Sequence, residues 1–224
     1  MLFFNRSSTA PASSNRAPVA QRRTPQPAIR CADLVALVVF NDHGKVLNGF
    51  ISAFDGSFAK AVQALPNAVC GSWTNIADGL SVANDLLGRM PRGLRRRIWL
   101  LSDGCANPHN NAIWDEVARA RAQWTNINTI GFGNPHEFDR DLLARIADAT
   151  HNGHYYEATT VAALGQAFRR AASSRKGTNH RGEATVFCID TSGSMTAAME
   201  GQRRIEAVRD ALNSLLVYKQ KMWS

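Results

Sequence analysis

The sequence has few of the features that mark several large classes of protein. Its 224 residues contain only four cysteines (Cys31, Cys70, Cys105 and Cys188), and no two of them form a Cys-x-x-Cys pair. This spacing argues against structural zinc, and four cysteines in a chain of this size do not make a disulfide framework. A reducing compartment fits this cysteine usage, so we expect a cytoplasmic protein.

Long apolar runs and nucleotide-binding motifs are also missing. No run of 18 apolar residues occurs, and residues 1–4 are too short for the core of a signal peptide, so we expect no membrane attachment. Gly177 and Gly182 have the glycine spacing of a phosphate-binding loop, but Glu183 stands where that loop needs lysine. No Gly-x-Ser-x-Gly elbow surrounds a serine, which argues against a hydrolase of that class.

Acidic residues are absent from the first 30 positions, which carry five arginines. The formal net charge is +8, and residues 31–224 carry only +3 of it, because 21 of the 26 basic residues and all 18 acidic residues lie there. The basic character therefore belongs mainly to the tail and does not imply a nucleic-acid-binding fold. Residues 1–29 are rich in Pro, Ser and Arg, so we expect a disordered tail.

From residue 30 onward, short apolar runs alternate with segments of helical periodicity. This alternation predicts one α/β domain over residues 30–224, with a doubly wound, mostly parallel sheet. The first two strands are close enough to form a hairpin, which gives one antiparallel edge strand. A polar linker is expected at residues 173–183. Strands are expected at 32–40, 45–51, 97–102, 127–132, 154–157 and 184–189, and helices at 54–65, 76–87, 113–124, 138–146, 161–171 and 195–222.

The segment Asp190-Thr191-Ser192-Gly193-Ser194 directly follows the last expected strand. A carboxylate and two hydroxyls at alternate positions can face one point where the strand ends, and ligands of open α/β sheets bind at that edge. Oxygen donors suit a hard divalent cation such as Mg²⁺ better than zinc. Taken alone, the same residues are also compatible with a helix cap.

Two further positions extend this pattern into a resemblance. Asp190-x-Ser192-x-Ser194, Thr74 at a Thr-Asn helix entry, and Asp103 in Leu-Leu-Ser-Asp-Gly together resemble the metal-ion-dependent adhesion site of von Willebrand factor type A (VWA) domains. The match extends over about residues 31–217 and implies a Rossmann-like VWA fold. The order differs from the family, in which the serine-bearing strand and helix come first. Because each expected element occurs once, we interpret the chain as a circularly permuted VWA domain.

The resemblance implies a binding module that is not an enzyme. Ser192, Ser194 and Thr74 would offer hydroxyl oxygens to Mg²⁺, with Mn²⁺ or Ca²⁺ as alternatives, and Asp190 and Asp103 would act mostly through bound water. A Glu or Asp of a protein partner would complete the shell. Such standalone domains serve as adaptors or scaffolds, some of them beside AAA-type ATPases. Candidate residues for the rim that contacts the partner are Trp73, Asn75, Asn107, His109 and His136.

Three alternatives remain open at this stage. Asp190 followed by hydroxyl residues is also similar to metal-dependent phosphohydrolases, although Ser192 stands where their second acid is required. Nucleic acid could bind through the basic tail and linker, which would make binding strongly salt-dependent. A closed monomer is favoured, but residues 184–223 could instead insert into a neighbouring chain as a strand-swapped dimer.

Overall fold

The computed structural model describes residues 33–52, 55–105, 110–173 and 182–223. The predicted tail at residues 1–29, most of the predicted linker, and the rim candidates Asn107 and His109 lie outside the described residues.

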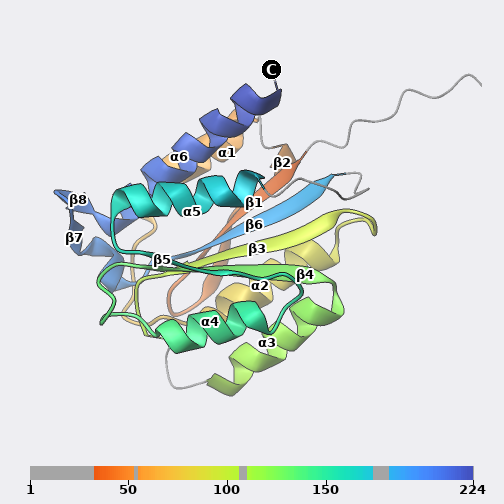
Figure 1. The fold of residues 1–224 in the computed structure, drawn as a ribbon, viewed down its shortest axis with the longest axis horizontal. Coiled ribbons are helices and arrows are strands. Elements are labelled where there is room, and N and C mark those ends of the chain that lie inside the picture. The colour runs from red at the N-terminus through yellow and green to blue at the C-terminus, as the bar shows by residue number, and fades with distance from the viewer. Residues whose placement is uncertain (1–32, 53–54, 106–109, 174–181, 224) are drawn as a thin grey trace, which may run out of the picture.

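A six-stranded sheet forms the centre of the domain, in the order β2-β1-β6-β3-β4-β5 (Figure 1). Strand β2 pairs with β1 in antiparallel fashion, and the pairings among the other strands are parallel. This confirms the predicted α/β class with a mostly parallel sheet and one antiparallel edge strand. The strands are β1 (Leu34–Phe40), β2 (Gly44–Ser52), β3 (Arg95–Ser102), β4 (Thr125–Phe132), β5 (Tyr155–Ala158) and β6 (Glu183–Asp190).

Strand β6 is the last long strand in the sequence, yet it lies in the middle of the sheet. It pairs with β1 from Leu34↔Ala184 to Phe40↔Asp190, and with β3 along its other edge. All of its residues after Glu183 are buried, as expected of a parallel strand covered on both faces. The register places the end of β6 between the ends of β1 and β3, and thereby positions Asp190 at the carboxyl edge of the sheet.

Helices cover both faces of the sheet (Figure 1). Helices α1 (Gly56–Gln63), α5 (Val161–Ser173) and α6 (Arg204–Trp223) pack on one face, and α2 (Ile76–Gly88), α3 (Asn110–Ala122) and α4 (Arg140–Asp148) pack on the other. Alternate residues of a strand enter opposite cores: Phe187 and Ile189 face the first helix group, whereas Val186 and Cys188 face the second. The two cores cover the faces of the sheet and leave its carboxyl edge for polar groups.

The last predicted helix begins later than expected. Periodicity predicted a helix over residues 195–222, but α6 begins at Arg204. The 3₁₀ helix η2 (Gly193–Thr196) and a small hairpin of β7 (Ala198–Met199) and β8 (Gln202–Arg203) come before it. Glu200 and Gly201 have φ values of 49° and 86°, and two consecutive positive φ angles make the tight turn that joins paired strands. The prediction was wrong here because the apolar periodicity starts only at Ile205.

Two other helix ends have local causes. Helix α1 ends at Gln63 and is followed by the 3₁₀ helix η1 (Leu65–Asn67), which contains the predicted stop, Pro66. Helix α3 ends at Ala122, two residues before the predicted end, because Trp124 adopts a left-handed backbone conformation with φ of 56°.

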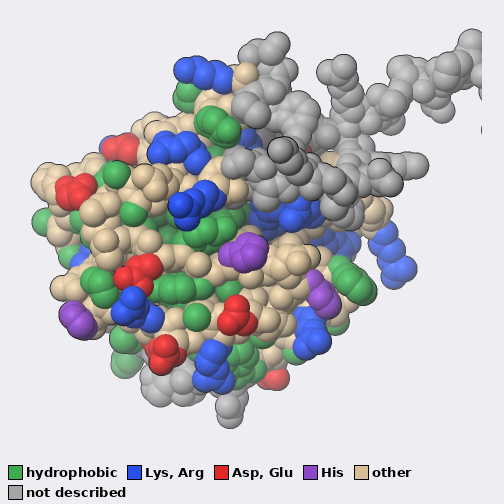
Figure 2. Space-filling view, viewed as in Figure 1, with side chains coloured by type: hydrophobic (Ala, Val, Ile, Leu, Met, Phe, Trp, Pro, Cys, Tyr) green, Lys and Arg blue, Asp and Glu red, His purple; other side chains and the backbone are tan. Residues whose placement is uncertain are grey.

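The surface of the described residues does not present a single sign of charge on the face that Figure 2 shows. Basic and acidic side chains are interspersed there. A surface that binds along the backbone of a nucleic acid carries a continuous basic stripe.

Among the described residues, none of the helices has both the length and the apolar character that a membrane span requires.

Candidate metal centre

The segment after β6 turns sharply and brings its two serines together. The backbone N–H of Ser192 donates to Oδ1 of Asp190 at 2.8 Å, which fixes the turn, and the hydroxyls of Ser192 and Ser194 lie 2.9 Å apart. Ser192 occupies the N-cap position of η2, but its side chain makes no capping hydrogen bond. The hydroxyl is therefore directed to the other polar groups of the site and not to the helix end.

Thr74 joins this cluster from the loop before α2. Its side chain is buried, and its Oγ1 donates to the Ser192 hydroxyl at 3.3 Å. The loop is held from two sides, because the N–H of Trp73 donates to Asp42 Oδ1 and the N–H of Cys70 donates to the carbonyl of Thr191. The second bond ties the Thr74 loop directly to the serine segment.

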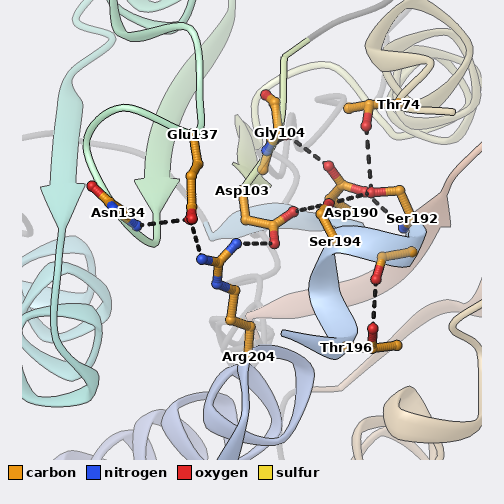
Figure 3. A network of polar contacts seen from close by, with 12 residues as sticks. Thr74, Asp103, Gly104, Asn134, Glu137, Asp190, Ser192, Ser194, Thr196 and Arg204 are labelled. Carbon is orange, nitrogen blue, oxygen red and sulfur yellow. Dashed lines mark hydrogen bonds and ion pairs between the residues drawn. The ribbon is translucent and has the colours of Figure 1, made fainter. Parts of the chain in front are cut away.

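The carboxylates come from adjacent strands and are fully buried. Ser194 Oγ donates to Asp103 Oδ1 at 2.6 Å (Figure 3). Ser102 Oγ donates to Asp190 Oδ2 at 2.7 Å. Both Asp103 and Asp190 have no exposed surface. Thr74, Ser192, Ser194 and Asp103 thus form one continuous chain of hydrogen bonds, and Ser102 is a supporting residue that the sequence analysis did not assign.

Burial disfavours charge on both carboxylates. Desolvation and the nearby charge of Asp103 raise the pKa of Asp190 from 3.8 to about 7. Desolvation also raises the pKa of Asp103, although hydrogen bonds from Ser194 and Arg204 oppose that effect. A site with two buried carboxylates and raised pKa values gains stability when a cation neutralises them.

Arg204 and Glu137 form the other side of the site, and the sequence analysis missed both. Arg204 Nη1 donates to Asp103 Oδ2 at 2.8 Å, and Nη2 donates to Glu137 Oε2 (Figure 3). The Arg204 side chain is 7% exposed, whereas that of Glu137 is 46% exposed. No periodicity or motif identifies these residues, since the contacts depend on the β7–β8 turn and on the loop between β4 and α4.

A pocket of about 480 Å³ opens beside these groups. The structure describes three of the predicted rim residues, Trp73, Asn75 and His136. None of the three lines this pocket, although they lie on loops at the same edge of the sheet. Asn75 caps α2 by accepting a hydrogen bond from the N–H of Asp78. The lining residues are Ser72, Thr74, Asp103, Gly104, Cys105, Glu137, Ser192, Gly193, Ser194, Ala197 and Arg204.

The donor set fits a hard divalent cation. All five residues predicted to surround the ion supply oxygen, and four of them line the pocket, with the buried carboxylate of Asp190 directly behind Ser192. These donors are hydroxyls and carboxylates and include none of the Cys and His ligands of structural zinc. In the described part of the chain, no group of three or more His, Cys, Asp or Glu side chains is placed to hold a metal ion.

Other residues considered from the sequence have separate surroundings. Cys70, Cys105 and Cys188 are free thiols, so the described cysteines form no disulfide. The ring of His151 stacks on that of Trp124, with centroids 4.6 Å apart, and His154 contacts Tyr156 edge-on. These histidines make aromatic contacts away from the pocket.

The fold and the site together define an α/β domain with a hydroxyl- and carboxylate-lined pocket at the carboxyl edge of its parallel strands. The family model of the von Willebrand factor type A domain matches residues 29–170. The chain therefore belongs to the VWA domain family. The matched region ends before β6 and therefore does not include Asp190, Ser192, Ser194 or Arg204.

Solved structures with a similar fold include a von Willebrand factor type A protein from Catenulispora acidiphila. It is 20% identical with a TM-score of 0.53, and the match covers 62% of this chain and 33% of that one. An uncharacterized membrane spanning protein from Vibrio fischeri is 24% identical (TM-score 0.32; 64% of this chain, 77% of that one). Proximal thread matrix protein 1 from the mussel byssus is 25% identical (TM-score 0.45; 55% and 30%).

The chain spans only about a third of the length of the Catenulispora acidiphila protein. A search of curated protein sequences found no match.

Proposed function

We propose that this chain is a divalent-cation-dependent protein-binding module that captures an acidic side chain of a partner. One observation carries the proposal. Three hydroxyls from two distant segments converge within hydrogen-bonding distance, next to two fully buried carboxylates, at the wall of an open pocket. VWA domains commonly mediate protein interactions, and this arrangement supplies a specific means of doing so.

In this proposal Thr74, Ser192 and Ser194 hold Mg²⁺ with neutral oxygens, and Asp103 and Asp190 balance its charge. With few anionic ligands, a bound Mg²⁺ keeps much of its positive charge and attracts a carboxylate from outside. Other residues of the chain position these groups. Ser102 and the N–H of Ser192 orient Asp190 through hydrogen bonds, and the backbone hydrogen bond from Cys70 to Thr191 keeps the Thr74 loop in place. Mn²⁺ or Ca²⁺ is an alternative ion.

The proposed role is that of an adaptor or scaffold without catalytic activity. Both carboxylate oxygens of Asp190 accept hydrogen bonds in the buried interior, which disfavours a nucleophilic role for this residue. The partner supplies a Glu or Asp, and Trp73 and His136 are the described candidates for contacts around it. An AAA-type ATPase, which the family resemblance implies for some members, is the first partner to test. Three free thiols fit a cytoplasmic setting.

We further propose that the chain is circularly permuted and closes as a monomer. The family match stops at residue 170, yet β6 lies between β1 and β3 within the same chain. Gly182, directly before β6, accepts a hydrogen bond from the N–H of Arg95 at the start of β3. A chain re-ordered so that residues 182–223 precede residues 33–173 should fold to a domain of similar stability, measured by urea unfolding. Failure to fold would contradict the permutation.

The metal-binding part of the proposal is tested by titration calorimetry with Mn²⁺ on the full chain. We expect one ion to bind per chain, and Ser194→Ala to weaken binding while the circular dichroism spectrum stays unchanged. Ser214→Ala is the matched control, because Ser214 is an exposed serine on α6 whose hydroxyl donates to the carbonyl of Asp210 in the same helix. Absence of Mn²⁺ binding to the wild-type chain would contradict the proposal.

The partner-binding part is tested by capture from a cell lysate with Mg²⁺ and with EDTA, using wild-type chain and Ser194→Ala. Capture that requires both Mg²⁺ and Ser194 supports the adaptor role. Turnover of an aryl phosphate with Mg²⁺ that is abolished by Asp190→Ala would instead indicate a phosphohydrolase. Binding of nucleic acid that is insensitive to EDTA would indicate a different function for the chain.

A further inference from the structure

The pocket already contains a cation of its own, the guanidinium of Arg204. Its Nη1 holds Oδ2 of Asp103, whose Oδ1 accepts the bond from Ser194. The same carboxylate thus joins the hydroxyls on one side to an arginine on the other (Figure 3). An arginine that is 7% exposed and paired with a fully buried aspartate lies within the site and is not a surface charge that solvent screens.

The backbone around Arg204 is shaped to admit the guanidinium at this place. Gly133, at the end of β4, has φ of +133°, and a Cβ atom there would lie 3.1 Å from Cζ of Arg204. The N–H of Arg204 donates to the carbonyl of Ala197, which fixes the start of α6 after the small hairpin. Nε of Arg204 is buried and has no hydrogen-bond partner among the described residues. The side chain is therefore positioned by packing and by its two carboxylates.

We propose that Arg204 is an internal counter-cation that competes with the divalent ion for Asp103 and so lowers the affinity of the site for that ion. This inference rests on the proposed metal-binding function. Arg204 keeps Asp103 compensated when no divalent ion is bound. It also places a positive charge beside the ion when one binds, and the two like charges repel each other.

Glu137 sets how strongly Arg204 competes. Its carboxylate accepts hydrogen bonds from Nη2 of Arg204, the terminal nitrogen that Asp103 does not use, and from the N–H of Asn134. Because Arg204 pairs with two carboxylates, the positive charge of its guanidinium is largely balanced, and its electrostatic effect on nearby groups is weaker. Without the charge of Glu137, the full positive charge of Arg204 acts on Asp103 and on the divalent ion. The two residues therefore have opposite effects on ion affinity.

The test is a double-mutant cycle in which the dissociation constant for Mn²⁺ alone is measured by titration calorimetry. We expect Arg204→Gln to bind Mn²⁺ about tenfold more tightly than the wild type, and Glu137→Gln to bind it several-fold more weakly. In the double variant, the effect of Glu137→Gln should disappear, because the charge acts through Arg204. Arg204→Lys, which keeps the charge, should stay close to the wild type.

Two matched controls separate this coupling from a change in net charge. Arg209→Gln removes a positive charge further along α6, where Arg209 pairs with the half-exposed Asp210. Asp141→Asn removes a negative charge from the exposed first turn of α4, four residues from Glu137. Both controls should change Mn²⁺ affinity by less than about twofold.

The outcomes distinguish this inference from the proposed function. If the wild-type chain binds Mn²⁺ and Arg204→Gln binds it no more tightly, the inference alone is overturned. If no variant binds Mn²⁺, both fail. If only Arg204→Gln binds it, the inference is supported and the proposed function is contradicted. If Arg204→Gln does not fold, the Glu137→Gln variant tests the inference in its place. A Mn²⁺ affinity of Glu137→Gln equal to that of the control Asp141→Asn then overturns the inference.

Discussion

The two halves of the pocket have different chemistry. The hydroxyl half, formed by Thr74, Ser192 and Ser194, offers neutral oxygens joined by hydrogen bonds. The ionic half, formed by Asp103, Glu137 and Arg204, contains two carboxylates and a buried guanidinium. In the proposed function the hydroxyl half accepts an added cation, whereas the ionic half already contains the guanidinium of Arg204. If the proposal holds, ion affinity depends on the balance between the two halves as well as on the donor atoms.

The largest expected effect comes from removing the internal cation of the ionic half. In EDTA, Arg204→Gln should lower the free energy of unfolding by about 3–5 kcal/mol, because it leaves the buried carboxylate of Asp103 uncompensated. Saturating Mn²⁺ should restore much of this loss. The measurement is urea unfolding followed by circular dichroism, with Arg209→Gln as the control. Equal stability of Arg204→Gln and the wild type in EDTA would show that Arg204 does not compensate Asp103.

The second effect is a pH dependence of the ion-free site. The folded pKa of Asp190 is about 7, above its usual value of 3.8, so between these values the folded state binds more protons than the unfolded state. The contribution of Asp190 to stability is therefore present below about pH 4 and is lost as pH rises through about 7. A shift of this size corresponds to at most about 4 kcal/mol.

This pH dependence is measured as the free energy of unfolding at pH 5 and pH 8 in EDTA, for the wild type and for Asp190→Asn. The wild type should lose about 2–3 kcal/mol more than the variant between the two pH values, because only the part of the pKa shift above pH 5 is sampled. Identical pH dependence of the two proteins would exclude Asp190 as the group responsible.

The third effect tests the hydroxyl half. Replacing Ser192 and Ser194 together by alanine should weaken Mn²⁺ binding by roughly 100-fold, since two neutral donors are lost and the carboxylates behind them stay in place. The carboxylates should keep a residual, weaker affinity. Titration calorimetry measures the change, with Ser214→Ala as the control. An unchanged dissociation constant would place the ion outside the hydroxyl half.

The smallest effect concerns the space that Gly133 leaves for Arg204. Gly133→Ala should destabilise the domain by about 1–2 kcal/mol, because alanine is strained at φ of +133° and its Cβ would press on the guanidinium. Gly49→Ala is the control, since a Cβ at Gly49 meets no atom within 4 Å. Urea unfolding measures both. In the Arg204→Gln variant, Gly133→Ala should lower the free energy of unfolding by less than it does in the wild type. If the loss is the same in both, backbone strain alone causes it.

The central strands of the sheet could be predicted from the sequence because they are buried on both faces. Strands such as β6 and β1 appear as short, nearly unbroken apolar runs, which are distinct from the helical periodicity between them. The start of α6 could not be predicted in this way. Its position depends on a two-residue turn at Glu200 and Gly201, and the periodicity carries no information about that turn.

The same contrast holds within the pocket. Asp190, Ser192 and Ser194 are close in sequence, so their common direction could be inferred from the strand that precedes them. Thr74 and Asp103 could be added only through the resemblance to the family, and the structure brings both to the serines. The Arg204 contacts span 101 residues to Asp103 and 67 residues to Glu137, and no local pattern predicts contacts over such separations.

The most direct test of the central claim is a crystal structure of the full chain grown with Mn²⁺, with anomalous scattering used to locate the ion. We expect one anomalous peak beside the hydroxyls of Thr74, Ser192 and Ser194, on the pocket side of Asp103 and Asp190. If crystals saturated with Mn²⁺ show no peak there, or show it at another group of residues, the proposed metal site is wrong.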